Sequence, residues 1–127
     1  ERPGRDRPAR RDERGTATSL VIAAAAVVLT LALATGVLAG YLTAFHRARH
    51  AADLAAVSGA AQVGRGEPGC ATAERIARAN GASRFTCDEV GDAVEFVVSV
   101  EIRVPVQPVL RGLPTEVPAR ADAGHLQ

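Results

Sequence analysis

The chain has 127 residues, a formal net charge of +1 and 47% hydrophobic residues. This length leaves room for one membrane segment and one small exposed domain, and it excludes a large enzyme core. Acidic and basic residues are interspersed and only 3% of residues are aromatic, so composition gives no argument for a nucleic-acid partner. The first residue is Glu rather than Met, which is consistent with a few residues missing upstream.

We expect residues 1–15 to form a basic leader. Residues 1–14 contain six Arg, four acidic side chains and two Pro. Such a segment cannot bury a core, so we expect it to be disordered. Its Arg residues outnumber Arg47 and Arg49, which follow the apolar run. The positive-inside rule therefore predicts a cytoplasmic leader and an extracytoplasmic C-terminal domain on a single-pass protein of the cell membrane.

An apolar stretch without a charged side chain then covers residues 16–45. A helix of this length would be about 45 Å long, against a bilayer core of about 30 Å. A small soluble domain could not surround a rod that is apolar on every face. We therefore predict a transmembrane helix with the lipid bilayer as its partner. A secretory signal cleaved at the small-residue site 32–34 is the alternative, but the apolar run continues past it as an anchor does.

Gly36 and Gly40 have the G-x-x-x-G spacing that lets another helix approach closely, although an Ala- and Gly-rich segment also produces this spacing by chance. The helical pattern continues through residues 46–63, which we expect to be an extracytoplasmic extension of the same helix. There Leu54, Val57 and Ala61 share one face and predict a packing surface.

Residues 64–113 predict a small head. Three Gly and a Pro within residues 64–69 end the first helix. A second helix follows over residues 70–80, with Gly81 as its C-cap.

Residues 84–90 and 94–104 alternate apolar with polar side chains and predict an antiparallel hairpin that packs on the helices. The fold class is thus α+β. Prolines at positions 105, 108, 114 and 118 argue against further central strands. We expect at most an edge strand over residues 109–113 and a flexible tail over residues 114–127.

Cys70 and Cys87 are the two cysteines of the chain. Both fall on the faces of their elements that we expect to be buried, and the charge rule places them in an oxidising compartment. We predict a disulfide that closes a loop of about 17 residues and stabilises the head by roughly 3 kcal/mol. Two free thiols are the alternative.

Two other clusters are weaker candidates for chemistry. His46 and His50 lie four residues apart with Asp53 beyond them, but neighbouring Arg side chains would repel a cation, so we predict no metal site. Asp88, Glu89, Asp92 and Glu95 surround the predicted hairpin turn, which offers no pocket for acid–base catalysis. We expect a non-enzymatic protein that binds no cofactor.

Several features of the sequence occur in a recognisable order: Arg14-Gly15 before the apolar helix, Arg47-x-x-x-Ala51-Ala52-Asp53-Leu54-Ala55-Ala56 after it, a helix from Cys70 to Asn80-Gly81-Ala82, then Cys87 and a Val-rich strand. This order resembles the TadE-like proteins of Flp/Tad pilus assembly. The match looks closest to the branch that is named for a helicase and secretion gene neighbourhood in high-GC Gram-positive bacteria.

The resemblance implies a pseudopilin-type component of a Flp/Tad-type pilus or secretion system, with a pilin-like head and other pilin-like or Tad-system membrane subunits as partners. It also implies cleavage by a prepilin peptidase after Gly15, which would leave Thr16 as the new N-terminus. The chain departs from the pilin pattern at Leu20, because pilin-like signals carry Glu at this position. A membrane-anchored or secreted small extracellular binding module is the alternative function.

Overall fold

The computed structural model describes residues 13–92 and 94–125. The chain divides into two compact units, residues 1–36 and 37–127, which we describe separately. Most of the predicted leader lies outside the described residues. The long helix predicted from the sequence is present as α1 (Glu13–Val63), 51 residues long.

In the first unit, α1 is exposed on all sides. The large side chains of Leu20, Ile22 and Leu31 are all exposed. Thr30, a polar side chain in this stretch, donates its hydroxyl hydrogen bond to the Ala26 carbonyl of the same helix at 2.8 Å. The described part of α1 therefore contains one segment that is long and apolar enough to cross a membrane, and this segment is not buried.

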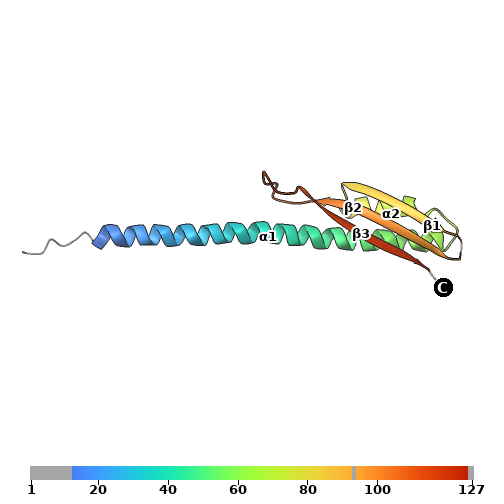
Figure 1. Cartoon of the computed structure of the whole chain (residues 1–127), viewed down its shortest axis with the longest axis horizontal. Coiled ribbons are helices and arrows are strands. Elements are labelled where there is room, and N and C mark those ends of the chain that lie inside the picture. The colour runs from blue at the N-terminus through green and yellow to red at the C-terminus, as the bar shows by residue number, and fades with distance from the viewer. Residues whose placement is uncertain (1–12, 93, 126–127) are drawn as a thin grey trace, which may run out of the picture. The chain divides into compact units, whose positions relative to one another are not determined.

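The second unit adds a short helix and an antiparallel sheet to the remainder of α1. The helix is α2 (Gly69–Ala79), and the strands are β1 (Arg84–Gly91), β2 (Phe96–Pro105) and β3 (Glu116–His125). The strands follow each other in the sheet in the order β1-β2-β3, so β2 is central (Figure 1). The α+β class predicted from the sequence is confirmed.

The core lies between one face of the sheet and the two helices. Alternate side chains of β2 are buried, as the sequence predicted: Phe96, Val98, Val100, Ile102 and Val104. The helices contribute mainly alanines to the same cluster: Ala44, Ala48, Ala51, Ala52, Ala55 and Ala56 from α1, with Ala73 and Ala77 from α2. Small side chains on the helices leave room for the bulky Val and Ile side chains of the sheet.

The helix face that packs is not the one the sequence suggested. Leu54 and Val57 are 50% and 60% exposed, and Ala61 is exposed too. The alanine face packs instead because the backbones approach closely there. A Cβ atom added to Gly59 would lie only 3.2 Å from Cγ1 of Val98 and 3.1 Å from the Gly69 carbonyl oxygen. A leucine in this position would force the helix away from the sheet.

The prediction of a flexible tail over residues 114–127 is wrong for residues 116–125, which form β3, and residues 109–113 belong to a loop rather than to a strand. Pro118 pairs in register with Arg103 of β2. A proline is tolerated there because β3 is an edge strand, where one row of backbone groups needs no partner in the sheet. Val117 and Ala121 of β3 are buried against the core.

Candidate functional site

The predicted disulfide is confirmed. Cys70 in the first turn of α2 is bonded to Cys87 in β1, with an S–S distance of 2.03 Å and a Cα–Cα distance of 5.7 Å. The bond joins the helix to an edge strand of the sheet. Glu89 lies on the same strand, and its carboxylate accepts a hydrogen bond from the Gly69 N–H at the start of α2, at 3.2 Å. The start of α2 is therefore held to β1 by a covalent bond and a polar contact.

Gly36 and Gly40 differ in their surroundings. A Cβ atom on Gly36 would meet nothing within 4 Å. One on Gly40 would overlap the backbone carbonyl of Gln107, which belongs to the loop between β2 and β3. The close approach at Gly40 is therefore made by the chain's own loop. Packing of a second subunit at Gly36 stays a prediction.

Gly15 and Thr16, the residues of the predicted cleavage site, lie in the first turns of α1. The Gly15 carbonyl accepts a hydrogen bond from the Ser19 hydroxyl at 2.6 Å, and a Cβ atom on Gly15 would meet nothing within 4 Å. A peptidase would have to unwind this turn to reach the peptide bond, because the backbone of a helix is tied up in its own hydrogen bonds. Cleavage at this site stays a prediction.

His46, His50 and Asp53 are all exposed on α1. Within residues 13–92 and 94–125, no three His, Cys, Asp or Glu side chains gather closely enough to hold a metal ion.

The acidic residues at the β1–β2 connection have structural contacts. One Asp92 carboxylate oxygen accepts hydrogen bonds from the backbone N–H groups of Glu95, at 2.9 Å, and Val94, at 2.8 Å. These bonds hold the pKa of the Asp92 carboxyl below its usual value, because they favour its ionised form. Asp92 thus closes the turn between the strands. The second strand was predicted to begin at residue 94, but β2 begins at Phe96, which pairs with Gly91.

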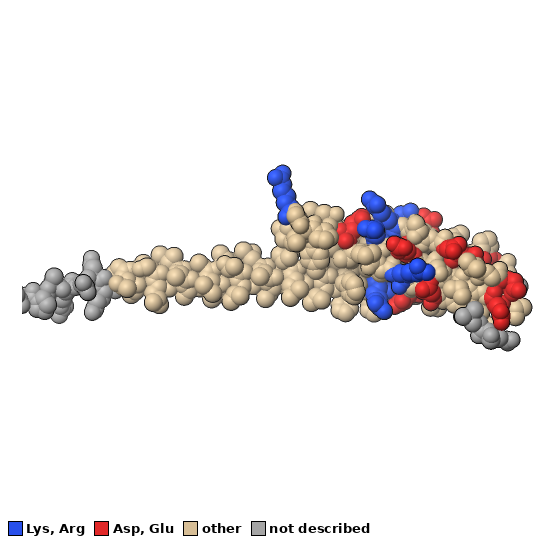
Figure 2. Space-filling view, viewed as in Figure 1, with Lys and Arg blue, Asp and Glu red and all other residues tan. Residues whose placement is uncertain are grey.

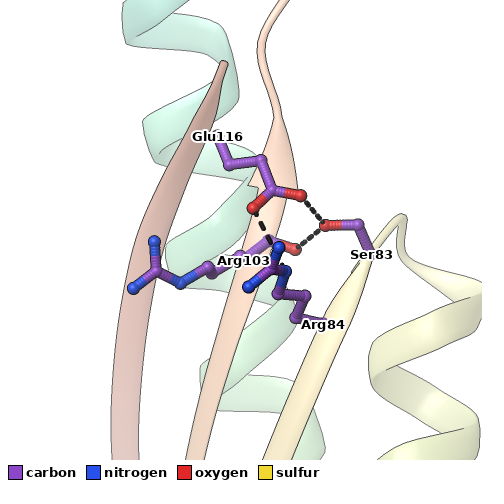
Figure 3. Close-up of polar contacts among 4 residues, drawn as sticks. All are labelled: Ser83, Arg84, Arg103 and Glu116. Carbon is purple, nitrogen blue, oxygen red and sulfur yellow. Dashed lines mark hydrogen bonds and ion pairs between the residues drawn. The ribbon is translucent and has the colours of Figure 1, made fainter. Parts of the chain in front are cut away.

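A polar cluster at one end of the sheet was not predicted from the sequence. The Glu116 carboxylate of β3 accepts a hydrogen bond from the Ser83 hydroxyl at 2.8 Å and lies 3.6 Å from Nε of Arg84 at the start of β1. The Ser83 hydroxyl also lies 3.0 Å from the Arg103 carbonyl oxygen of β2 (Figure 3). The cluster joins all three strands. The sequence did not predict this cluster because Glu116 belongs to β3, and the prolines had led us to expect a flexible tail there.

The outward face of the sheet carries charges of both signs (Figure 2). Thr86, Asp88, Ser99, Glu101 and Arg120 line a shallow hollow there. A hydrogen bond from the Ser99 hydroxyl, and to a lesser extent the neighbouring Arg120, lower the pKa of the Asp122 carboxyl. The Arg120 guanidinium lies 3.5 Å from the Asp122 carboxylate, so these two exposed groups form an ion pair on this face. The arrangement suits contact with another polar surface better than enclosure of a small substrate.

No protein-family model matches this sequence, and comparisons with curated proteins and with solved structures likewise found no match.

Proposed function

We propose that this protein is a non-enzymatic, membrane-anchored structural component of a Flp/Tad-type pilus or secretion system, similar in kind to the TadE-like pseudopilins. The observation that carries the proposal is the difference in burial between the two parts of α1. Its first part exposes Leu, Ile and Val side chains on every face, whereas its later part buries a row of alanines under a sheet. An exposed apolar helix of this length needs lipid or other helices around it.

The head supports an extracytoplasmic location. Disulfides persist in oxidising compartments and are rare in the cytoplasm, and the head contains the Cys70–Cys87 bond. The excess of Arg residues before the apolar stretch agrees with a cytoplasmic N-terminus. Both arguments favour a topology in which the lipid bilayer surrounds the first part of α1 and the head lies outside it.

Assembly with other subunits would re-bury the apolar helix when it leaves the bilayer. Removing about 20 apolar residues from lipid is costly unless neighbouring helices cover them. The open surface at Gly36, where a Cβ atom would meet nothing, is available for such a neighbour. In pilin-like signals a Glu stands where this chain has Leu20, so its contacts with neighbouring subunits would rely on apolar packing rather than on a charge pair.

Mass spectrometry of the mature N-terminus tests the proposal. A chain that begins at Thr16 would support processing by a prepilin peptidase. A chain that begins at Thr35 would indicate ordinary secretion of a soluble head and would contradict the proposal. A Gly15→Leu variant provides the control, since it should abolish prepilin-type cleavage without creating a contact in the structure, where Gly15 faces open space.

A further inference from the structure

The loop between β2 and β3, residues 106–115, exposes apolar side chains. Val109, Leu110 and Leu113 are 61%, 39% and 44% exposed. The Leu113 N–H donates to the Leu110 carbonyl at 3.3 Å, and Gly112 has a φ angle of +86°, so these residues form a tight turn that also contains Arg111. Three exposed aliphatic side chains on one short loop indicate a surface that is covered by an apolar partner.

Two contacts fix this loop beside α1 within residues 37–127. The Tyr41 hydroxyl donates a hydrogen bond to the Pro114 carbonyl at 2.5 Å. Gly40 lies so close to the Gln107 carbonyl that no side chain would fit between them. Figure 1 shows the loop running alongside the helix. The loop is therefore held at the level of Gly40 and Tyr41.

Gly40 and Tyr41 belong to the end of the apolar stretch. The nearby Leu38 and Leu42 are exposed, and the first charged residue after them is Arg47. If α1 spans a bilayer, Tyr41 is suited to the headgroup region, where Tyr side chains are enriched. About 20 helical residues fill the hydrocarbon core, so the core would then cover roughly residues 20–40. This register places the loop at the outer headgroup boundary.

The chemistry of the loop fits that depth. An irregular backbone is not tolerated in the lipid-exposed hydrocarbon core, so the turn cannot lie much deeper. At the boundary its aliphatic side chains can enter the acyl region while a guanidinium group reaches the phosphates. Arg111 is in the turn, and Arg47 lines the hollow between α1 and Gln107 at the base of the loop. Two basic side chains therefore accompany the apolar ones.

We propose that residues 106–115 form an interfacial loop that inserts Val109, Leu110 and Leu113 into the outer leaflet. This inference rests on the proposed membrane anchoring of α1, and it gives the head a second attachment to the bilayer. Its partner is a phospholipid surface, with the anionic phosphates facing Arg111. The two attachments would restrict tilting of the head with respect to the membrane surface.

Tryptophan fluorescence can test the loop because the protein contains no Trp. Leu113→Trp is introduced into the full-length chain, which is reconstituted into phosphatidylcholine–phosphatidylglycerol vesicles with and without brominated lipids. Val94→Trp is the matched control, since Val94 is 62% exposed but lies in the β1–β2 turn. Leu29→Trp, at a position 61% exposed in the first part of α1, reports whether the helix is in the bilayer.

We expect the Leu113→Trp emission to be blue-shifted and strongly quenched by lipids brominated near the headgroup, while the Val94→Trp emission stays water-like and unquenched. Quenching of Leu29→Trp without quenching of Leu113→Trp would overturn the loop insertion and leave the membrane helix intact. A blue shift of Leu113→Trp without lipid quenching would mean that another protein surface covers the loop, and would also overturn it. Failure of Leu29→Trp to be quenched by lipids brominated deep in the acyl chains, where residue 29 would lie, would instead refute the membrane anchoring itself.

Discussion

Single glycines set how closely the elements of the head approach one another. A Cβ atom added to Gly69 would lie 2.6 Å from the Gly59 carbonyl oxygen and 2.7 Å from a methyl group of Val63. Contacts this short require the backbone of α1 or α2 to move. The start of α2 also contains Cys70, so a shift there would act on the disulfide as well.

We therefore expect Gly69→Ala to lower the free energy of unfolding of the head by about 1–3 kcal/mol, the usual cost of overpacking. Gly36→Ala is the matched control, since its new methyl group meets nothing within 4 Å and Ala favours a helix. Thermal unfolding of both variants in detergent, followed by circular dichroism, measures the difference. Equal unfolding temperatures for the two variants would contradict the close packing of α1 on α2.

Asp92 should make the stability of the β1–β2 turn depend on pH. Its pKa is lowered in the folded state by the N–H groups of Glu95 and Val94, so its contribution is present above the ordinary pKa of an aspartate and is lost as the pH falls through the folded value. Asp92→Ala should thus destabilise the head at pH 7 and have little effect at strongly acidic pH. NMR titration of the Asp92 carboxyl carbon checks this. A midpoint at or above the usual value for aspartate would refute it.

At the scale of the secondary-structure elements, the Cys70–Cys87 disulfide links α2 directly to β1. It joins residues 17 positions apart, and closing a loop of this size contributes about 3 kcal/mol on the chain-entropy estimate. Reduction should lower the unfolding temperature of the wild-type head. A Cys70→Ser/Cys87→Ser double variant should unfold at that lower temperature whether or not reductant is present. If reductant left the wild-type transition unchanged, the bond would not be stabilising the head.

The elements also show how far the sequence could predict the fold. Both β2 and the Cys70–Cys87 disulfide were predicted from the sequence. Apolar and polar side chains alternate along β2, and the chain has two cysteines on faces expected to be buried. β3 was missed because its sequence lacks the usual features of a strand. It contains a proline and several short side chains: Pro118, Ala119, Ala121 and Ala123. The packing face of α1 was also predicted wrongly, because side-chain size was taken as the sign of burial. Large apolar residues suggested burial, whereas close approach of the backbones selected alanines.

At the scale of the molecule, the described residues comprise a long apolar helical segment and a folded head. The apolar segment was predictable because a chain this small cannot bury so long a run of uncharged residues within itself. The position of the loop at residues 106–115 was not predictable, since it depends on contacts with Gly40 and Tyr41, which are far away in sequence. No local pattern in the sequence reports such a contact.

Protease access on the two sides of the membrane is the decisive test of the proposed topology. The full-length chain, with an epitope after Gln127, is exposed to protease in cells whose wall has been removed and in inside-out membrane vesicles. We predict that the epitope is cleaved in the cells and is protected in the vesicles. Without protease, we predict that the tagged chain remains in the membrane fraction after a high-salt wash. An epitope that is protected in cells and cleaved in vesicles, or a full-length chain with residues 1–15 intact that stays soluble without detergent, would contradict the proposed membrane anchoring.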